Sequence, residues 1–325
     1  MPEPFQFLPG VKLVLFGVNT HNTNNLETTP DLEKGGTSMQ WKGRQGSANV
    51  EDRRGMGGMG GGKMIGGGIG GIILVIIITL LGGGGPGDIM SAITGGGNGS
   101  TVVYQESAQD KELAEFVSVV LADTEKTWDE IFRQEGLDYK EPTLVLYSGS
   151  VESACGVSGA SAGPFYCPGD QKLYIDLSFY DELQQKFQAP GDFAMAYVIA
   201  HEVGHHVQTL LGTTNKVMPL RQQLSEAQFN QYLVRFELQA DYYAGVWARS
   251  AQGQQLLEEG DLEEALTAAS AVGDDTIQKK AQGYVVPESF THGTSAQRKQ
   301  AFYEGFQSGK LGGMDPMAAG NASGW

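Results

Sequence analysis

Three residues near the middle of the chain have the types and spacing of a zinc-binding motif. His201, Glu202 and His205 stand in the run H-E-V-G-H. On a helix, two histidines four positions apart lie one turn apart on the same face, so both imidazoles can bind one zinc ion. Glu202 is rotated by roughly 100° from His201 and is placed to reach a water molecule rather than the metal. The motif therefore predicts a zinc site that carries its own general base.

A catalytic zinc ion needs a third protein ligand and an open position for water. The three-histidine motif H-E-x-x-H-x-x-G-x-x-H does not fit, because Gln208 and Leu211 occupy the places of its glycine and third histidine. Glu237 and Asp241, four residues apart in E-L-Q-A-D, lie at the edge of an apolar helical stripe, where carboxylates are costly unless neutralised. We expect Glu237 to bind zinc and Asp241 to orient a ligand histidine. Asp241 as the ligand and a solvated acidic edge are the alternatives.

A further histidine, His292, stands in the run T-H-G-T-S-A-Q-R after Pro287. A loop histidine that reaches the cleft could donate a hydrogen bond to the oxyanion of a tetrahedral intermediate. Arg298 could orient it or bind substrate. The alternative is an exposed histidine with no role.

Helices are expected to position these groups. The motif helix can begin with a cap at Asp192 and end near Gly212, and apolar residues recur between them at helical spacing. Ser225 with Gln228 predicts a capping box at the start of the helix that carries Glu237.

An earlier amphipathic helix is predicted from about Ser107 to Glu135, and residues 143–147 and 172–176 are predicted strands. These patterns favour an α+β domain that is mostly helical with a small sheet.

The run 64–81 contains 18 uncharged residues and would span roughly 27 Å as a helix, close to the thickness of a bilayer core. Basic residues such as Arg53, Arg54 and Lys63 precede this run, and the first basic residue after it is Lys111. The positive-inside rule then predicts a single-pass membrane protein with a cytoplasmic N-terminus and an extracytoplasmic catalytic domain.

The domain organisation follows from these segments. We expect a cytoplasmic extension and glycine-rich linker at 1–63, a transmembrane helix at 64–81, a linker at 82–106, a zinc metallopeptidase domain at 107–311 and a flexible tail at 312–325.

Charge and cysteine content bound the function and the environment. The net charge of −16 disfavours nucleic acid as a partner, because its binders need a basic face. Cys155 and Cys167 are the two cysteines of the chain, twelve residues apart, and are predicted to form a disulfide in an oxidising compartment. Two free buried thiols are the alternative.

Several motifs occur together and in order along the chain. They are W-K-G-R and N-V-E-D-R-R-G between Trp41 and Gly55, C-G and G-P-F-Y-C-P between Cys155 and Pro168, K-L-Y-I-D-L-S-F-Y, H-E-V-G-H-H-V-Q, E-L-Q-A-D-Y-Y-A-G-V-W-A and H-G-T-S-A-Q-R. From about residue 39 to about residue 309, the chain resembles the bacterial neutral zinc metallopeptidase family.

The pair of H-E-x-x-H with E-x-x-A-D also resembles the wider gluzincin group. In that group the glutamate is the third zinc ligand and the aspartate supports a histidine, which carries over onto Glu237 and Asp241. The resemblance implies a zincin-like fold, in which the substrate backbone pairs with an edge strand above the active-site helix. Residues 173–176 would be that strand.

Taken together, the residues and the resemblance predict a zinc-dependent metallopeptidase, an endopeptidase rather than an exopeptidase, with a polypeptide substrate. Glu202 would be the general base and His292 the oxyanion donor. One rival is a non-catalytic zinc-fold scaffold or binding protein at the cell envelope. Another is a serine hydrolase built on Ser161 in G-A-S-A-G, which lacks the strand-turn-helix context of that motif.

Overall fold

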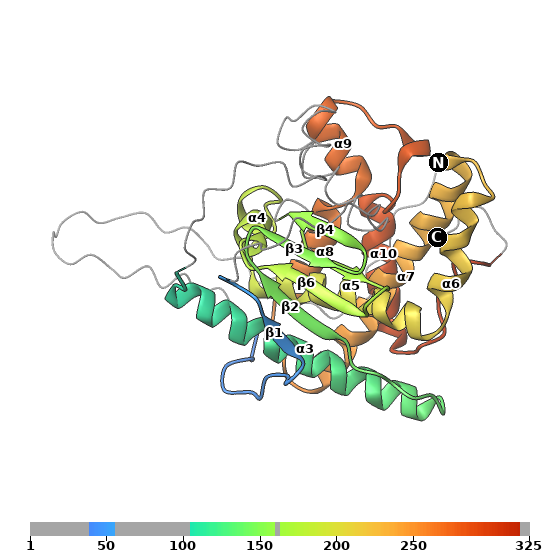
Figure 1. The fold of residues 1–325 in the computed structure, drawn as a ribbon. Coiled ribbons are helices and arrows are strands. Elements are labelled where there is room, and N and C mark those ends of the chain that lie inside the picture. The colour runs from blue at the N-terminus through green and yellow to red at the C-terminus, as the bar shows by residue number, and fades with distance from the viewer. Residues whose placement is uncertain (1–38, 56–104, 160–162, 319–325) are drawn as a thin grey trace, which may run out of the picture. The chain divides into compact units, whose positions relative to one another are not determined.

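Helices outweigh strands in the part of the chain that the computed structural model describes, residues 39–55, 105–159 and 163–318 (Figure 1). The strands are β1 (Val50–Asp52), β2 (Thr143–Tyr147), β3 (Ser150–Ser153), β4 (Gly156–Gly159), β5 (Phe165–Cys167) and β6 (Lys172–Asp176). The helices are α3 (Ala108–Gln134), α4 (Phe179–Gln185), α5 (Asp192–Leu210), α6 (Thr213–Val217), α7 (Glu226–Gly253), α8 (Asp261–Ala271), α9 (Asp274–Gln282) and α10 (Ser295–Ser308), with 3₁₀ turns η2 (Met218–Gln222) and η3 (Pro287–Ser289). The predicted mixed α+β class is confirmed.

The main sheet has the strand order β1-β2-β6-β5, in which β1, β2 and β6 are parallel and β5 is antiparallel to β6. Alternate side chains of β2 and β6 enter two different cores. Leu144 and Leu173 face the large helical core, whereas Val145 and Tyr174 pack with Val151 of the β3–β4 hairpin. The sheet is therefore covered on both faces.

The position of β6 corrects one expectation. Residues 173–176 were predicted to form the edge that receives a substrate backbone, but β6 lies between β2 and β5. The edge strands are β1 and β5, and the Tyr166 hydroxyl of β5 lies 3.1 Å from His206 Nδ1 on α5. The alternation of residues in β6 cannot reveal this order, because the short strand β5, which precedes β6 in the sequence, pairs with its outer side.

The predicted disulfide between Cys155 and Cys167 is confirmed. Cys155 lies in the β3–β4 turn and Cys167 ends β5, so the bond ties the hairpin to the edge strand. Cys167 is fully buried within the smaller core.

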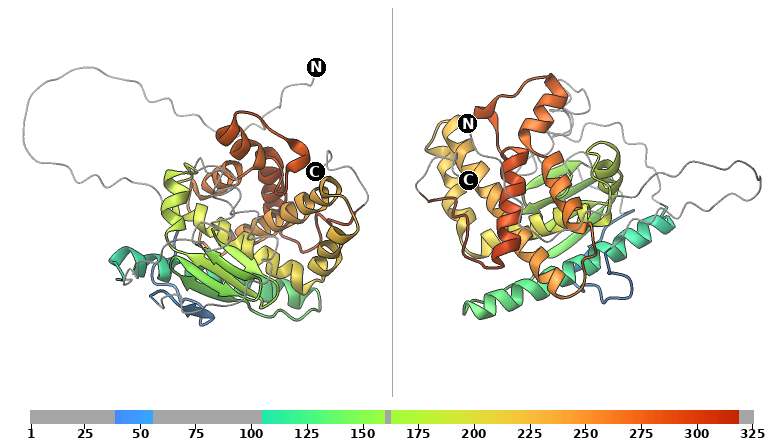
Figure 2. Two further views of the ribbon diagram at one scale, coloured as in Figure 1. Left: turned by 45° about the horizontal axis from the view of Figure 1, so that its top comes forward. Right: turned by 180° about the vertical axis from the view of Figure 1, so that it is seen from behind.

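Helices α5, α7, α8 and α10 gather on the side of the sheet away from the β3–β4 hairpin (Figure 2). The contact between α7 and α10 is so close that it requires glycine on both helices. A Cβ atom on Gly245 would lie 1.9 Å from the Phe302 carbonyl oxygen, and one on Gly305 would lie 1.8 Å from the Tyr242 carbonyl oxygen. This contact places the C-terminal half of α10 against the middle of α7.

We expect Gly305→Ala to destabilise the protein by about 1–3 kcal/mol, because the added methyl group forces backbone apart in a packed interface. Gly253→Ala is the matched control, since a Cβ atom there meets nothing within 4 Å. That substitution should be neutral or stabilise by up to about 1 kcal/mol. Urea unfolding of both variants checks the difference, and equal unfolding free energies would contradict it.

Residues 39–55 belong to the folded unit rather than standing apart from it. The side chains of Met39 and Trp41 are buried in the large core, and β1 extends the sheet through β2. This segment was predicted to belong to an N-terminal extension, because it is polar and precedes the glycine-rich run.

The predicted membrane location is wrong. A single crossing at 64–81 would separate residues 39–54 from residues 107–311, yet Val50 and Leu144 are partners in one sheet and Arg54 pairs with Glu106. No helix within the described ranges is long and apolar enough to cross a membrane. The longest, α3 and α7, carry charged residues along their length. Residues 64–81 themselves lie outside the described ranges.

Candidate metal centre

The site forms where α5 crosses α7, and Gly204 makes the crossing close. A Cβ atom on Gly204 would lie 2.9 Å from the Ala240 carbonyl oxygen. Ala240 lies between Glu237 and Asp241 on α7, so the glycine of H-E-V-G-H brings both carboxylates up to the histidines of α5. The helix follows from local sequence: Ser225 and Gln228 form the predicted capping box at the start of α7.

His201, His205 and Glu237 turn three ligand atoms toward one point, all within 4.8 Å of one another. Glu237 Oε2 lies 3.2 Å from His201 Nε2 and 3.4 Å from His205 Nε2. Two ligands at about 2.0–2.1 Å from zinc in a tetrahedral arrangement lie about 3.3–3.4 Å apart. The three side chains therefore fit a zinc ion with two nitrogen ligands, one oxygen ligand and one open position.

Asp241 holds His201 in place from behind. The Asp241 carboxylate lies 2.8 Å from His201 Nδ1, and it accepts hydrogen bonds from the Tyr197 hydroxyl at 2.5 Å and from Arg298 Nε at 2.7 Å. Asp241 is fully buried and Arg298 is 4% exposed. Arg298 was expected to orient His292 or bind substrate; instead it neutralises Asp241 from α10.

A neutral amide orients His205. The side-chain oxygen of Gln208 lies 2.8 Å from His205 Nδ1, and its amide nitrogen donates to the Phe236 carbonyl and to Gln239. The His205 ring also stacks on Phe236, with 5.1 Å between centroids. With Nδ1 engaged on both histidines, Nε2 is the nitrogen that faces Glu237.

Buried charges set the electrostatics of the centre. Burial alone would lower the pKa of His201, but the charge and hydrogen bond of Asp241 outweigh it and raise this pKa to about 10. Burial acts in the opposite direction on Asp241, where the charges of Arg298 and His201 hold the pKa below its usual range. Glu237 is likewise held ionised by His205 and His292 against the effect of burial. Both carboxylates are thus held ionised, Asp241 against Arg298 and Glu237 facing the two histidine nitrogens.

Glu202 lies beside the ligands without joining them. It is 9% exposed, and burial raises the pKa of its carboxyl group, while the nearby histidines and a backbone hydrogen bond from Tyr166 act against that rise. The edge strand β5 therefore borders the carboxylate that the motif predicts as the base.

His292 is buried in the loop before α10 and is held by Asp274, the first residue of α9. The Asp274 carboxylate accepts backbone hydrogen bonds from Thr291 and His292, each at 2.7 Å, and from Gly293 at 3.0 Å. His292 Nδ1 lies 3.4 Å from the same carboxylate. The charge of His292 acts on Glu237, but His292 is not part of the three-residue ligand group.

The predicted residues thus divide into groups. His201, His205 and Glu237 converge, Asp241 backs His201 and Glu202 adjoins them. His292 is not among the converging ligands. Sequence reasoning missed Gln208, Tyr197 and Asp274. Tyr197 lies four residues before His201 on the same helical face, so spacing could have found it; Asp274 had no local signal. Ser161 lies outside the described residues.

Comparisons with known proteins agree along almost the whole described chain. Residues 39–316 match the model of the family described as "Putative neutral zinc metallopeptidase". The uncharacterized protein YpfJ of Escherichia coli strain K12 is 51% identical over 279 residues, which are 83% of this chain and 96% of the relative. The uncharacterized protein Rv2575 of Mycobacterium tuberculosis is 40% identical over 205 residues, 60% of this chain and 68% of the relative. No solved structure gives a significant match.

Proposed function

The chain belongs to the neutral zinc metallopeptidase family, whose cofactor is zinc, and on that premise we propose that it hydrolyses peptide bonds at the crossing of α5 and α7. The observation that carries the proposal is the position of Glu237 Oε2, 3.2 Å and 3.4 Å from the two histidine nitrogens. These separations fit one tetrahedral zinc ion bound by His201, His205 and Glu237.

Zinc, when bound, supplies a Lewis acid that polarises the scissile carbonyl and activates water near neutral pH. Glu202 accepts the proton of the attacking water and passes it to the leaving amine. Its raised pKa suits both steps, since the group must take up a proton and then release it. Asp241 and Gln208 keep the two histidine rings oriented throughout.

His292 is the proposed donor to the oxyanion that forms on the substrate. Asp274 faces its Nδ1, which leaves Nε2 for the substrate, and in the protonated imidazolium Nε2 also carries a proton to donate. Three backbone hydrogen bonds to Asp274 hold the loop, so the imidazole is placed before substrate arrives.

We assign a zincin-like fold to the domain, with β5 as the strand that pairs with the substrate backbone. β5 is one of the two edge strands of the sheet, and its Tyr166 backbone borders Glu202. We further propose that the enzyme is an endopeptidase, which cuts within a chain rather than at its ends. Arg298, which could otherwise bind a free carboxyl terminus, is engaged with Asp241.

The rival function is a zinc-fold scaffold or binding protein without catalysis. A scaffold has no use for a buried base beside the metal ligands, and Glu202 occupies that place. The complete set of ligands, base and orienting groups favours the peptidase.

Cleavage of an unfolded protein and of an internally quenched peptide with blocked ends tests the proposal. We expect the purified full-length protein to cut both, to lose the activity with a zinc chelator, and to regain it when zinc is restored. Cleavage that resists the chelator would contradict a zinc peptidase. No cleavage by zinc-loaded protein would favour the scaffold, and cleavage only of peptides with free ends would overturn endopeptidase action.

A further inference from the structure

A second group of carboxylates lies at the N-terminal end of α5, the helix that carries His201 and His205. The sequence predicted that Asp192 caps α5, but the cap residue is Gly191 and no side chain of the cap makes the capping bond. Glu264 of α8 does so instead, accepting from the Phe193 backbone N–H at 3.1 Å. A Cβ atom on Gly191 would lie 2.0 Å from the Glu264 carboxylate, so glycine makes room for it there.

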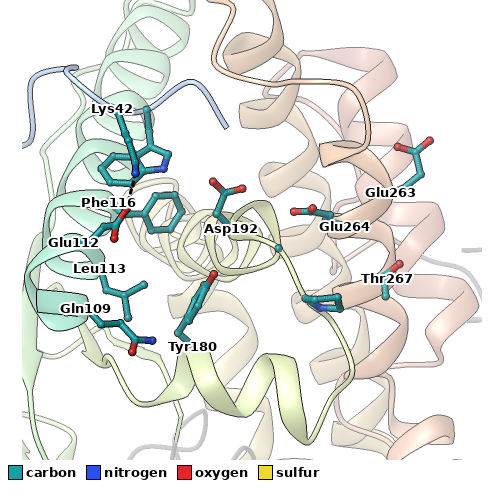
Figure 3. Close-up of a pocket in the computed structure, with 13 residues that line it drawn as sticks. Lys42, Gln109, Glu112, Leu113, Phe116, Tyr180, Asp192, Glu263, Glu264 and Thr267 are labelled. Carbon is teal, nitrogen blue, oxygen red and sulfur yellow. Dashed lines mark ion pairs between the residues drawn. The ribbon is translucent and has the colours of Figure 1, made fainter. Parts of the chain in front are cut away.

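Three carboxylates converge at this point. One oxygen each of Asp192, Asp261 and Glu264 lie within 4.8 Å of one another. Asp192 and Glu264 line a pocket of about 730 Å³ between α3, α5 and α8, and Figure 3 shows both carboxylates directed toward its interior. Asp261 is fully buried.

One oxygen of Asp261 points independently to a missing partner. Asp261 Oδ2 accepts from the Glu258 backbone N–H at 2.8 Å, but Oδ1 is buried with no hydrogen-bond partner among the described residues. A buried polar atom left unsatisfied costs about 1–3 kcal/mol, and more when the group is charged. A cation that bridges Oδ1 to the two neighbouring carboxylates would remove that cost.

The lysine that lines the pocket is paired with a different carboxylate, and the three carboxylates repel one another. Lys42 is the cation that lines the pocket, but its ammonium pairs with Glu112 at 2.7 Å on the α3 side, as Figure 3 shows. Burial, reinforced by mutual repulsion with Asp192, raises the pKa of Asp261 to about 6 and of Glu264 to about 7. Ionised carboxylates here are therefore under strain that a bound cation would relieve.

We propose that Asp192, Asp261 and Glu264 bind a divalent cation that prefers oxygen ligands, with calcium favoured over magnesium. All donors are carboxylate oxygens, which suit hard cations. Calcium accepts about 6–8 oxygen ligands in a flexible geometry, whereas magnesium demands a near-ideal octahedron and gives up its waters reluctantly. Three carboxylates from two helices, each of which already accepts a backbone hydrogen bond, suit the more flexible calcium shell, and the pocket admits the waters that would complete it.

The bound cation would join three parts of the fold. Asp192 is the first residue of α5 and also accepts from the Met39 backbone N–H at 3.1 Å, while Asp261 and Glu264 lie in the first turn of α8. Calcium would then fix the start of the helix that carries His201 and His205. This site is independent of the zinc site and of whether the protein cleaves peptides.

Calcium binding by the full-length protein tests the proposal. The protein is stripped of divalent ions, reloaded with one equivalent of zinc, and titrated with calcium chloride by calorimetry, while Tm is followed over the same range. We expect one saturable calcium site and a Tm that rises with calcium concentration. Glu264→Gln and Asp261→Asn should weaken calcium binding at least tenfold. Neither should lower Tm in the absence of calcium, since each amide keeps an acceptor oxygen and removes repulsion.

Glu263→Gln is the matched control, because Glu263 is exposed, lines the same pocket and points away from Asp192 in Figure 3. It removes the same charge and should leave the calcium affinity within about twofold. No saturable binding by the wild type would overturn the proposal, as would equal calcium affinity in wild type and Glu264→Gln. Magnesium that binds as tightly as calcium would overturn the stated preference.

Discussion

Glu202→Gln is expected to lower kcat by about 10²–10⁴-fold while zinc remains bound. Glutamine has the shape of glutamate but cannot accept the proton of the attacking water. Glu202 is also not one of the three converging ligands, so its loss leaves the metal-binding atoms in place. The measurements are steady-state cleavage of the blocked peptide and zinc content by elemental analysis on the same preparation.

The control for this variant is Glu226→Gln, an exposed position in the first turn of α7. It makes the same chemical change away from the site and should retain full activity. A Glu202→Gln protein that keeps both zinc and wild-type kcat would show that another group is the base. A variant that loses zinc would place Glu202 among the ligands instead.

The sequence could predict those site residues that recur at the spacing of one helical turn. His201 and His205 are four residues apart, as are Glu237 and Asp241, and one turn of helix brings each pair to one face. The spacing cannot say how two helices cross. Gly204 controls that crossing through its contact with Ala240, and its effect becomes visible only when both helices are in place.

Contacts between distant segments explain the expectations that failed. Arg298 reaches Asp241 from a helix 57 positions later, and no local pattern connects the two. β1 pairs with β2, although the stretch between them in the sequence includes the predicted membrane span. A single crossing there would place the two strands on opposite sides of the membrane, so this pairing contradicts the predicted location. A parallel strand pair leaves no local mark comparable to a cap or a heptad, because its partner lies far along the chain.

Zinc affinity should fall in a fixed order among three variants that replace a carboxylate by its amide. Glu237→Gln should weaken zinc binding by more than about 100-fold, because even partners that only orient a ligand are worth about 10–100-fold. Asp241→Asn should fall within that range, since it keeps the geometry behind His201 but loses its charge. Glu202→Gln should leave zinc affinity nearly unchanged.

The order follows from how the buried charges balance. Glu202, Glu237 and Asp241 are three buried carboxylates, and Arg298 with one divalent ion matches their charge. Removing the charge of Glu237 takes away an atom that faces both histidines, whereas removing that of Asp241 leaves Arg298 without its ion pair, at a stability cost of about 3–5 kcal/mol. Asp241→Asn should therefore lower Tm more than Glu237→Gln does in metal-free protein, while lowering zinc affinity less.

Competition with a chromophoric chelator measures zinc affinity at one pH, and thermal unfolding fixes the temperature below which each variant stays folded. The assignment requires that Asp241→Asn has the larger effect on Tm and Glu237→Gln the larger effect on zinc affinity. If Asp241→Asn loses more zinc affinity than Glu237→Gln, the ligand and the supporting carboxylate are exchanged. If both variants bind zinc as the wild type does, the metal lies elsewhere, and the convergence of His201, His205 and Glu237 has only a structural role.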